Sequence, residues 1–100
     1  MFVYSVTVGV DKEIEQEWLV WMVNEHIPRV LDTGLFVDHK IFQVLTEEEN
    51  NISYNIQYFA ETLTHVETYL DRHAPRLIQE HQDKYRDRHV AFRTLLKEVK

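Results

Sequence analysis

The sequence is poor in several residue types whose scarcity narrows the chemistry open to it. Cysteine is absent, and glycine and proline occur only twice each in 100 residues. Without cysteine there is neither a disulfide framework nor thiol chemistry. Because the only glycines are Gly9 and Gly34, no glycine-rich loop is available to cradle a phosphate. Nucleotide binding by that route is therefore excluded.

Positive charge is also scarce. Lys and Arg total 11 against 17 Asp and Glu, which gives a net charge of −6. Nucleic acids and anionic membranes attract clustered basic side chains, so we expect neither as a partner. No apolar run approaches the roughly 20 residues that a membrane-spanning helix needs. The first residues, MFVYSVTVGV, lack the basic region and cleavage site of a signal peptide, and we therefore predict a cytoplasmic protein.

Apolar residues, by contrast, are plentiful. They make up 44% of the sequence. A domain of this length buries roughly 60–65% of the surface that its unfolded chain exposes. We therefore predict a single domain over residues 1–100 with a substantial core.

The apolar pattern changes period several times along the chain. Residues 2–10 alternate between apolar and small or polar side chains, which is typical of a strand with one buried face. The next helix should break at Pro28, which lacks a backbone donor, and stop at Gly34. A capping box at Thr64 opens a second helix, which Pro75 interrupts. The expected elements are strands at 2–10, 35–45, 52–59 and 88–96, helices at 12–26 (with a further turn at 28–31) and 64–85, and an acidic turn at 46–51.

The resulting order is βαββαβ. A short internal repeat agrees with it, because His-x-Pro-Arg occurs at residues 26–29 and again at 73–76, each time in a helix that follows a strand. Two βαβ halves make a ferredoxin-like sandwich. We therefore predict an α+β fold in which a four-stranded antiparallel sheet carries two helices on one face.

The polar side chains of the two central strands should lie together. If the apolar sides of these strands face the helices, their other sides form the open face of the sheet, near Arg93 or His89 of the last strand. One interpretation is a face that is solvated or buried in a dimer. The other is a ligand pocket between two subunits. The residues concerned are Ser5, Thr7, Asn55 and Gln57.

Two tryptophans dominate the first helix. Trp18 and Trp21 share one face with Glu25 at helical spacing. They either line a ligand cavity, with Tyr54 and Tyr58, or simply form core. Glu25 on this apolar stripe is a candidate general base with a raised pKa, although it also suits an ion pair with Arg29 one turn on.

The catalytic candidates are Glu25, His26 and Arg93. His26 lies nearer the flank of the helix, where packing or capping is the usual role. Arg93 either reaches Glu25 from the helix side of the sheet or recognises a carboxylate with its planar guanidinium. Histidines at 65, 73 and 81 are spaced by eight, so neighbours lie about 12 Å apart along a straight helix, too far to share a metal. We expect neither a metal nor a cofactor.

Several segments together resemble a bacterial domain family of unknown function, and the resemblance spans essentially the whole chain. The segments are Tyr4–Val8, Trp18–Pro28, Thr33–Gly34, Tyr54–Phe59 and Ala91–Leu96. That family is associated with the dimeric α+β barrel folds, which include small antibiotic-biosynthesis monooxygenases, EthD-like proteins and muconolactone-isomerase-like enzymes. The resemblance implies this fold and a dimer. It implies no activity and no catalytic residue.

Two classes of function follow. The first is a non-catalytic homodimer that binds a small molecule in an aromatic-lined cleft. The alternative is a cofactor-independent enzyme, monooxygenase-like or isomerase-like, that uses an acid/base residue. We expect a homodimer because the open sheet face should expose Val3 and Phe59, with Ala91 or Leu95 beside them, and such patches usually form interfaces.

Overall fold

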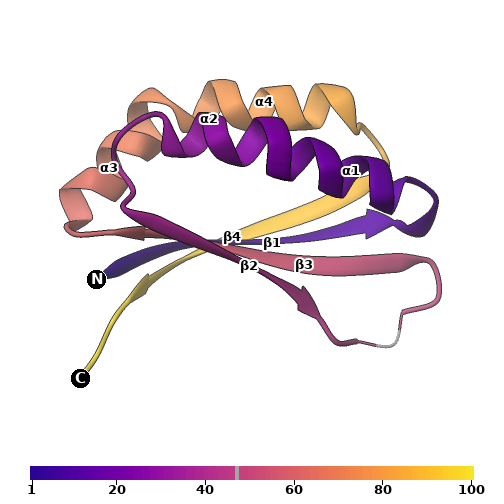
Figure 1. Cartoon of the computed structure of the whole chain (residues 1–100), viewed down its shortest axis with the longest axis horizontal. Coiled ribbons are helices and arrows are strands. Elements are labelled where there is room, and N and C mark those ends of the chain that lie inside the picture. Colours follow the sequence, from indigo (N-terminus) through magenta and orange to yellow (C-terminus); the bar gives the residue numbers. More distant parts are fainter. Residues whose placement is uncertain (47) are drawn as a thin grey trace.

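The computed structural model describes residues 1–46 and 48–100 and has the predicted βαββαβ order (Figure 1). Glu47, in the predicted acidic turn, lies outside the described residues. The elements are β1 (Phe2–Asp11), a 3₁₀ turn (Lys12–Ile14), α1 (Glu15–Trp21), a π-helical turn (Met22–His26), α2 (Ile27–Leu31), β2 (Asp38–Val44), β3 (Asn51–Ala60), α3 (Leu63–Arg72), α4 (Ala74–Lys84) and β4 (His89–Lys97).

The strands in the described part of the chain form one antiparallel sheet in the order β2-β3-β1-β4. Tyr4 of β1 lies opposite Tyr58 of β3, and Val6 lies opposite Arg93 of β4. All the helices cover the same face of this sheet (Figure 1). The predicted ferredoxin-like α+β fold is therefore confirmed.

The two faces of the sheet divide as the alternation predicts. Tyr4, Val8 and Val10 are buried beneath the helices together with Ile56. The alternate residues of β1 and β3 lie on the open face, where the Asn55 side chain donates hydrogen bonds to the hydroxyls of two β1 residues. The core consequently occupies only one side of the sheet.

The first helical segment contains the predicted irregularity, in the form of the π-helical turn ahead of Pro28. A π turn has one residue more than the matching α-helical stretch, so it rotates every later residue around the axis. His26 consequently turns inward and is buried, whereas Glu25 is exposed. The prediction that Glu25 shares the buried tryptophan face is wrong for this reason.

The second helical segment is broken near Pro75, as predicted, and Gly34 takes the left-handed conformation with φ 77°. The N-cap, however, is Thr62, whose hydroxyl accepts from the backbone N–H of His65 at 3.2 Å. The expected capping box at Thr64 is therefore wrong by two residues. Thr62 is extended, as an N-cap should be, so that its hydroxyl can reach the third N–H of the helix.

Among the described residues, no helix combines the length and the apolar character that crossing a membrane requires. The cytoplasmic location and the lack of a nucleic-acid partner stay predictions.

Candidate functional site

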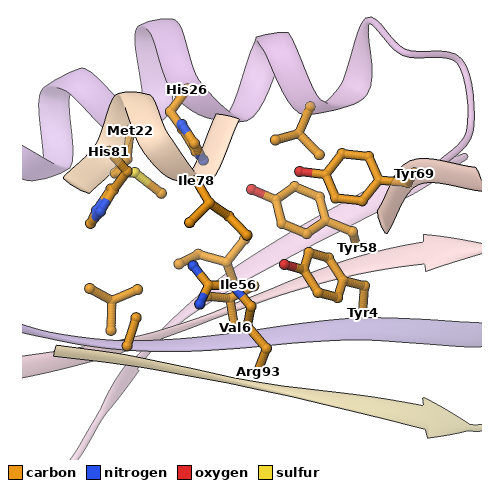
Figure 2. A pocket seen from close by; sticks show the side chains of 13 residues that line it. Tyr4, Val6, Met22, His26, Ile56, Tyr58, Tyr69, Ile78, His81 and Arg93 are labelled. Atoms are coloured by element: carbon orange, nitrogen blue, oxygen red, sulfur yellow. The ribbon is translucent and has the colours of Figure 1, made fainter. Parts of the chain in front are cut away.

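A cavity lies between the helices and the covered face of the sheet (Figure 2). About 30 Å³ of it is open to the centres of water molecules, and its total free volume, including the part that merges with solvent, is about 420 Å³. Since one water occupies about 10–15 Å³ on the first measure, the enclosed part holds about two or three waters. Its polar lining residues are Tyr4, His26, Tyr58, Tyr69, His81 and Arg93, and the rest of the wall is apolar.

Three tyrosines form one wall. Tyr4 and Tyr58 are direct partners across β1 and β3, and Tyr69 of α3 packs on Tyr4 with ring centroids 5.4 Å apart. Figure 2 shows their three hydroxyls pointing into the same space. Burial raises the pKa of all three phenols, so each stays protonated and able to donate a hydrogen bond.

Two buried imidazoles line the opposite wall. The π-helical turn brings in His26, and α4 supplies His81, with ring centroids 5.8 Å apart. Burial lowers the pKa of His26 to about 4 and that of His81 to about 3, so both rings are neutral at pH 7. The Nδ1 atom of His26 is buried and has no hydrogen-bond partner among the described residues. A buried polar atom without a partner costs free energy of folding, so such atoms are rare and each requires an explanation.

Arg93 lies at the mouth of the cavity. It is opposite Val6, whose side chain faces the helices, so Arg93 also points to the helix side. The expectation that it lies near the polar row of the open face is wrong, because that placement needed a register one residue away. Arg93 is exposed and makes no salt bridge within the described residues. Its guanidinium opposes the rise that burial causes in the Tyr4 pKa.

Glu25 does not meet Arg93. Its carboxylate lies 3.5 Å from Arg29, one turn along the helix, and Arg29 also pairs with Glu80 of α4. The first of the two interpretations of Glu25, a buried general base, is therefore wrong, and the ion pair with Arg29 is what the structure contains. Of the three catalytic candidates, only His26 and Arg93 border the cavity.

The two tryptophans stand behind the cavity wall rather than in it. Trp18 is fully buried, and its indole Nε1 donates a hydrogen bond of 2.9 Å to His81 Nε2. Trp21 packs on His26 with ring centroids 5.1 Å apart and on Tyr85 at 5.5 Å. Both indoles thus belong to the core and contact the imidazoles from outside the cavity.

The polar row of the open face is separate from the cavity. Asn55 donates to the Ser5 hydroxyl at 2.9 Å and to the Thr7 hydroxyl at 3.0 Å. Gln57 lies opposite Ser5 in the register. Because the sheet separates this row from His26 and Arg93, the ligand-binding and catalytic candidates proposed from the sequence lie on two different faces.

The sequence did not identify Tyr4, Tyr69 or His81 as cavity residues, and it named Tyr58 only as one possibility. Tyr4 and Tyr58 fall on the apolar side of their strands, and a phenol there carries a hydroxyl that needs a partner or a cavity. The position of Tyr4 on the apolar side of its strand was visible in the sequence and could have identified it. His81 lies one turn after the buried Leu77, but nothing local indicates that its partner is an indole 63 residues away.

No group of three or more His, Asp or Glu side chains among the described residues is arranged to hold a metal ion. The polar groups that the lining residues bring to the cavity are phenols, neutral imidazoles and one guanidinium.

The βαββαβ order and the antiparallel sheet with helices on one face define the ferredoxin-like α+β class. Solved structures of this fold resemble the chain at low sequence identity. An EthD (ethyl tert-butyl ether D) family protein from Bacillus halodurans has a TM-score of 0.68 and 13% identity, with 99% of this chain and 100% of that one covered. A dimeric ferredoxin-like protein from an uncultured marine organism has a TM-score of 0.67 and 13% identity, covering 100% and 96%.

SnoaB from Streptomyces nogalater, a cofactor-independent oxygenase, has a TM-score of 0.65 and 12% identity, with 99% and 94% covered. Identities this low establish the fold alone. No curated protein sequence matches the chain. The model of the DUF4286 family, a domain of unknown function, matches residues 1–99, and the chain belongs to that family.

Proposed function

We propose that this protein binds a small organic molecule in the cavity, through an oxygen acceptor such as a carboxylate or carbonyl. The observation that carries the proposal is the convergence of protonated phenols, neutral imidazoles and the Arg93 guanidinium on one apolar space (Figure 2). They come from separate elements, β1, β3, β4, α3, α4 and the π turn. A few converging polar groups in an apolar pocket are typical of ligand sites.

The charges at the cavity favour an anionic or strongly polarised ligand group. Arg93 brings a positive charge to the mouth and pairs with no carboxylate of the described residues. The phenols add donors deeper inside. A guanidinium recognises a carboxylate through two parallel N–H groups, which suits this position. A ligand cation, by contrast, would meet no charged acceptor among the lining residues.

The size of the cavity limits the group that enters. The enclosed 30 Å³ suits a carboxylate or carbonyl head with few further atoms. Arg93 is exposed and sits at the mouth, so movement of its side chain admits a longer ligand without disturbing the sheet. The apolar body of such a ligand would lie along Ile78 and Ala91, which are half-buried parts of the same wall.

A nuclear magnetic resonance (NMR) titration of the ¹⁵N-labelled protein with propionate tests the proposal. We expect shifts concentrated at His26, His81 and the tyrosine wall, and none with propan-1-amine. Arg93→Gln should abolish them. Arg72→Gln, which removes an exposed positive charge from α3, is the matched control and should bind as the wild type does. Equal shifts for acid and amine, or unchanged binding by Arg93→Gln, would contradict the proposal.

A cofactor-independent enzyme is the second candidate. Its support is that His26 has an unpaired nitrogen beside the cavity wall and that SnoaB, of similar fold, is a cofactor-independent oxygenase. A general base works best with a pKa near the working pH, and the His26 pKa of about 4 makes it a weak one. Binding is therefore the better-supported function.

We also infer a homodimer joined through the open sheet face. Val90, Phe92 and Leu96 of β4 lie opposite Gly9, Thr7 and Val3 and are exposed, Phe92 by 65%. The apolar residues of β4 on this face are thus these three, not Ala91 or Leu95, which face the helices. The dimeric ferredoxin-like protein of similar fold supports the inference.

Light scattering should give twice the chain mass of 12.1 kDa. We expect Phe92→Glu to give a monomer. Val20→Glu, which changes another exposed apolar residue, this one on α1, should leave the dimer intact. A wild-type monomer at micromolar concentration would rule the dimer out.

A further inference from the structure

The hydrogen bond between Trp18 and His81 determines more than packing. An indole Nε1 can only donate a hydrogen bond, so the atom that it meets must accept one. That atom is His81 Nε2, 2.9 Å away in the buried core. Nε2 therefore carries no proton. In a neutral imidazole the single proton must then sit on the other nitrogen, Nδ1.

The His81 proton finds no acceptor within the described part of the protein. No hydrogen bond from Nδ1 is formed there, and Nδ1 is not among the sealed, unpartnered polar atoms, unlike Nδ1 of His26. His81 itself lines the cavity (Figure 2). Its N–H group is therefore free for a ligand.

We propose that Trp18 locks His81 in the Nδ1–H tautomer, so that the cavity presents a fixed N–H donor and selects ligand groups that accept hydrogen bonds. The proposal rests on the function proposed above and deepens it, because it states the polarity of the ligand atom beside α4. Trp18 acts through His81 and is a positioning residue. This is the usual way in which the partner of one ring nitrogen decides the state of the other.

The neighbours of His81 support a neutral, fixed ring. His89 of β4 lies edge-on with ring centroids 4.3 Å apart, and its own Nδ1 is 2.8 Å from the Tyr85 carbonyl. A carbonyl only accepts, so His89 Nδ1 carries a proton. Trp21, His26 and the Arg93 charge complete the surroundings, and none of the described carboxylates bonds to the His81 ring. Burial and these neighbours oppose a second proton on His81.

The tautomer is measured directly on the ligand-free protein. Long-range ¹H–¹⁵N correlation spectra at pH 7 distinguish a protonated from a bare ring nitrogen. We expect His81 to show a protonated Nδ1 and a bare Nε2, and we expect a scalar coupling across the hydrogen bond between Trp18 Nε1 and His81 Nε2. A protonated Nε2, averaged signals of the two tautomers, or the absence of that coupling would overturn the proposal without any variant being needed.

Two matched variants separate the bond from the packing. Trp18→Phe keeps an aromatic ring but loses the donor, and the His81 signals should move to a mixture of tautomers. Trp21→Phe alters a ring that also packs on His81, at 5.8 Å, without forming that hydrogen bond, and it should keep the wild-type tautomer. An unaltered tautomer in folded Trp18→Phe would overturn the role of Trp18.

Ligand affinity is the secondary measurement. If Trp18→Phe leaves the two tautomers equally populated, the binding-competent fraction is one half, and propionate affinity should fall about twofold. The tautomer readout does not depend on propionate. Failure of the wild type to bind propionate would therefore reject the proposed function while leaving the assignment of the His81 proton to be decided by the spectra.

Discussion

The two faces of the sheet differ in whether their polar groups have hydrogen-bond partners. On the open face, Asn55 donates hydrogen bonds to the hydroxyls of Ser5 and Thr7, so these three side chains bond to one another. On the covered face, the His26 Nδ1 atom is buried without a hydrogen-bond partner among the described residues. Buried polar groups normally find partners. The covered face, where His26 Nδ1 lacks a partner within the described part of the chain, is the face on which we propose that a ligand binds.

The largest expected contrast between the faces comes from their aromatic side chains. Trp21 is 8% exposed and packs behind both imidazoles, so Trp21→Ala should lower the free energy of unfolding by about 3–5 kcal/mol. Phe92 on the open face is 65% exposed in the single chain. In a monomer, Phe92→Ala should change it by no more than about 0.5 kcal/mol. Urea melts of both variants, at protein concentrations low enough for the dimer to dissociate, measure the difference.

Equal losses of unfolding free energy in Trp21→Ala and Phe92→Ala would contradict this contrast. If Trp21→Ala keeps wild-type stability but no longer binds propionate, Trp21 is a ligand contact and the cavity reaches further than its present wall.

Acid should destabilise the covered face through its two histidines. The folded-state pKa values of His26 and His81, about 4 and 3, lie below the unfolded value of 6.5. Between pH 6.5 and the folded-state pKa values, the unfolded chain binds more protons than the folded chain. The stabilisation is therefore fully present above pH 6.5 and is lost as the pH falls. Each histidine should remove about 2 kcal/mol of unfolding free energy by pH 5.

Urea melts at pH 8, 6.5 and 5 measure this loss. The single variant His81→Gln should halve it, since His26 alone would remain. His39→Gln, which removes an imidazole from β2 outside the cavity, is the control and should lose stability with pH as the wild type does. Stability that is flat between pH 8 and 5 would mean that both rings are already solvated.

The fold was predictable from sequence because its signals are local. The alternation at residues 2–10, the breaks at Pro28 and Pro75 and the turn at Gly34 each act within a few residues. The site depends instead on offsets that no local pattern reports. One extra residue in the π turn moves His26 inward and Glu25 outward, and a one-residue difference in register decides which face Arg93 occupies.

Contacts between residues far apart in the sequence explain the rest of what could not be predicted. Trp18 meets His81 across 63 positions of the chain, which only the assembled helix layer brings about. Tyr58 was among the aromatic residues expected to line a cavity, but the packing of Tyr4 on Tyr58 and of Tyr69 on Tyr4 follows from the tertiary structure.

Removing single hydrogen-bonding groups should show the same contrast between the two faces, with smaller changes in unfolding free energy. Asn55→Ala takes away the donor of two bonds on the half-buried open face, and we expect a loss of about 1–2 kcal/mol. Tyr58→Phe removes a hydroxyl without a hydrogen bond to the described residues, so stability should change by less than about 0.5 kcal/mol. Chemical denaturation compares the two. An equal cost would show that the Tyr58 hydroxyl already has a partner, for example an ordered water.

The smallest expected effect concerns Glu25 and Arg93, which the geometry separates. Glu25 forms an exposed pair with Arg29 at 3.5 Å, and such pairs contribute about 0.3–0.5 kcal/mol at most. Because Arg93 lies at the cavity instead, the effects of Glu25→Gln and Arg93→Gln on stability should add, with a coupling below about 0.5 kcal/mol in a double-mutant cycle. Their effects on propionate binding should differ completely, since only Arg93→Gln removes the guanidinium at the mouth. A coupling well above that limit would place the two side chains in contact and return Arg93 to a structural role, leaving the cavity without its charge.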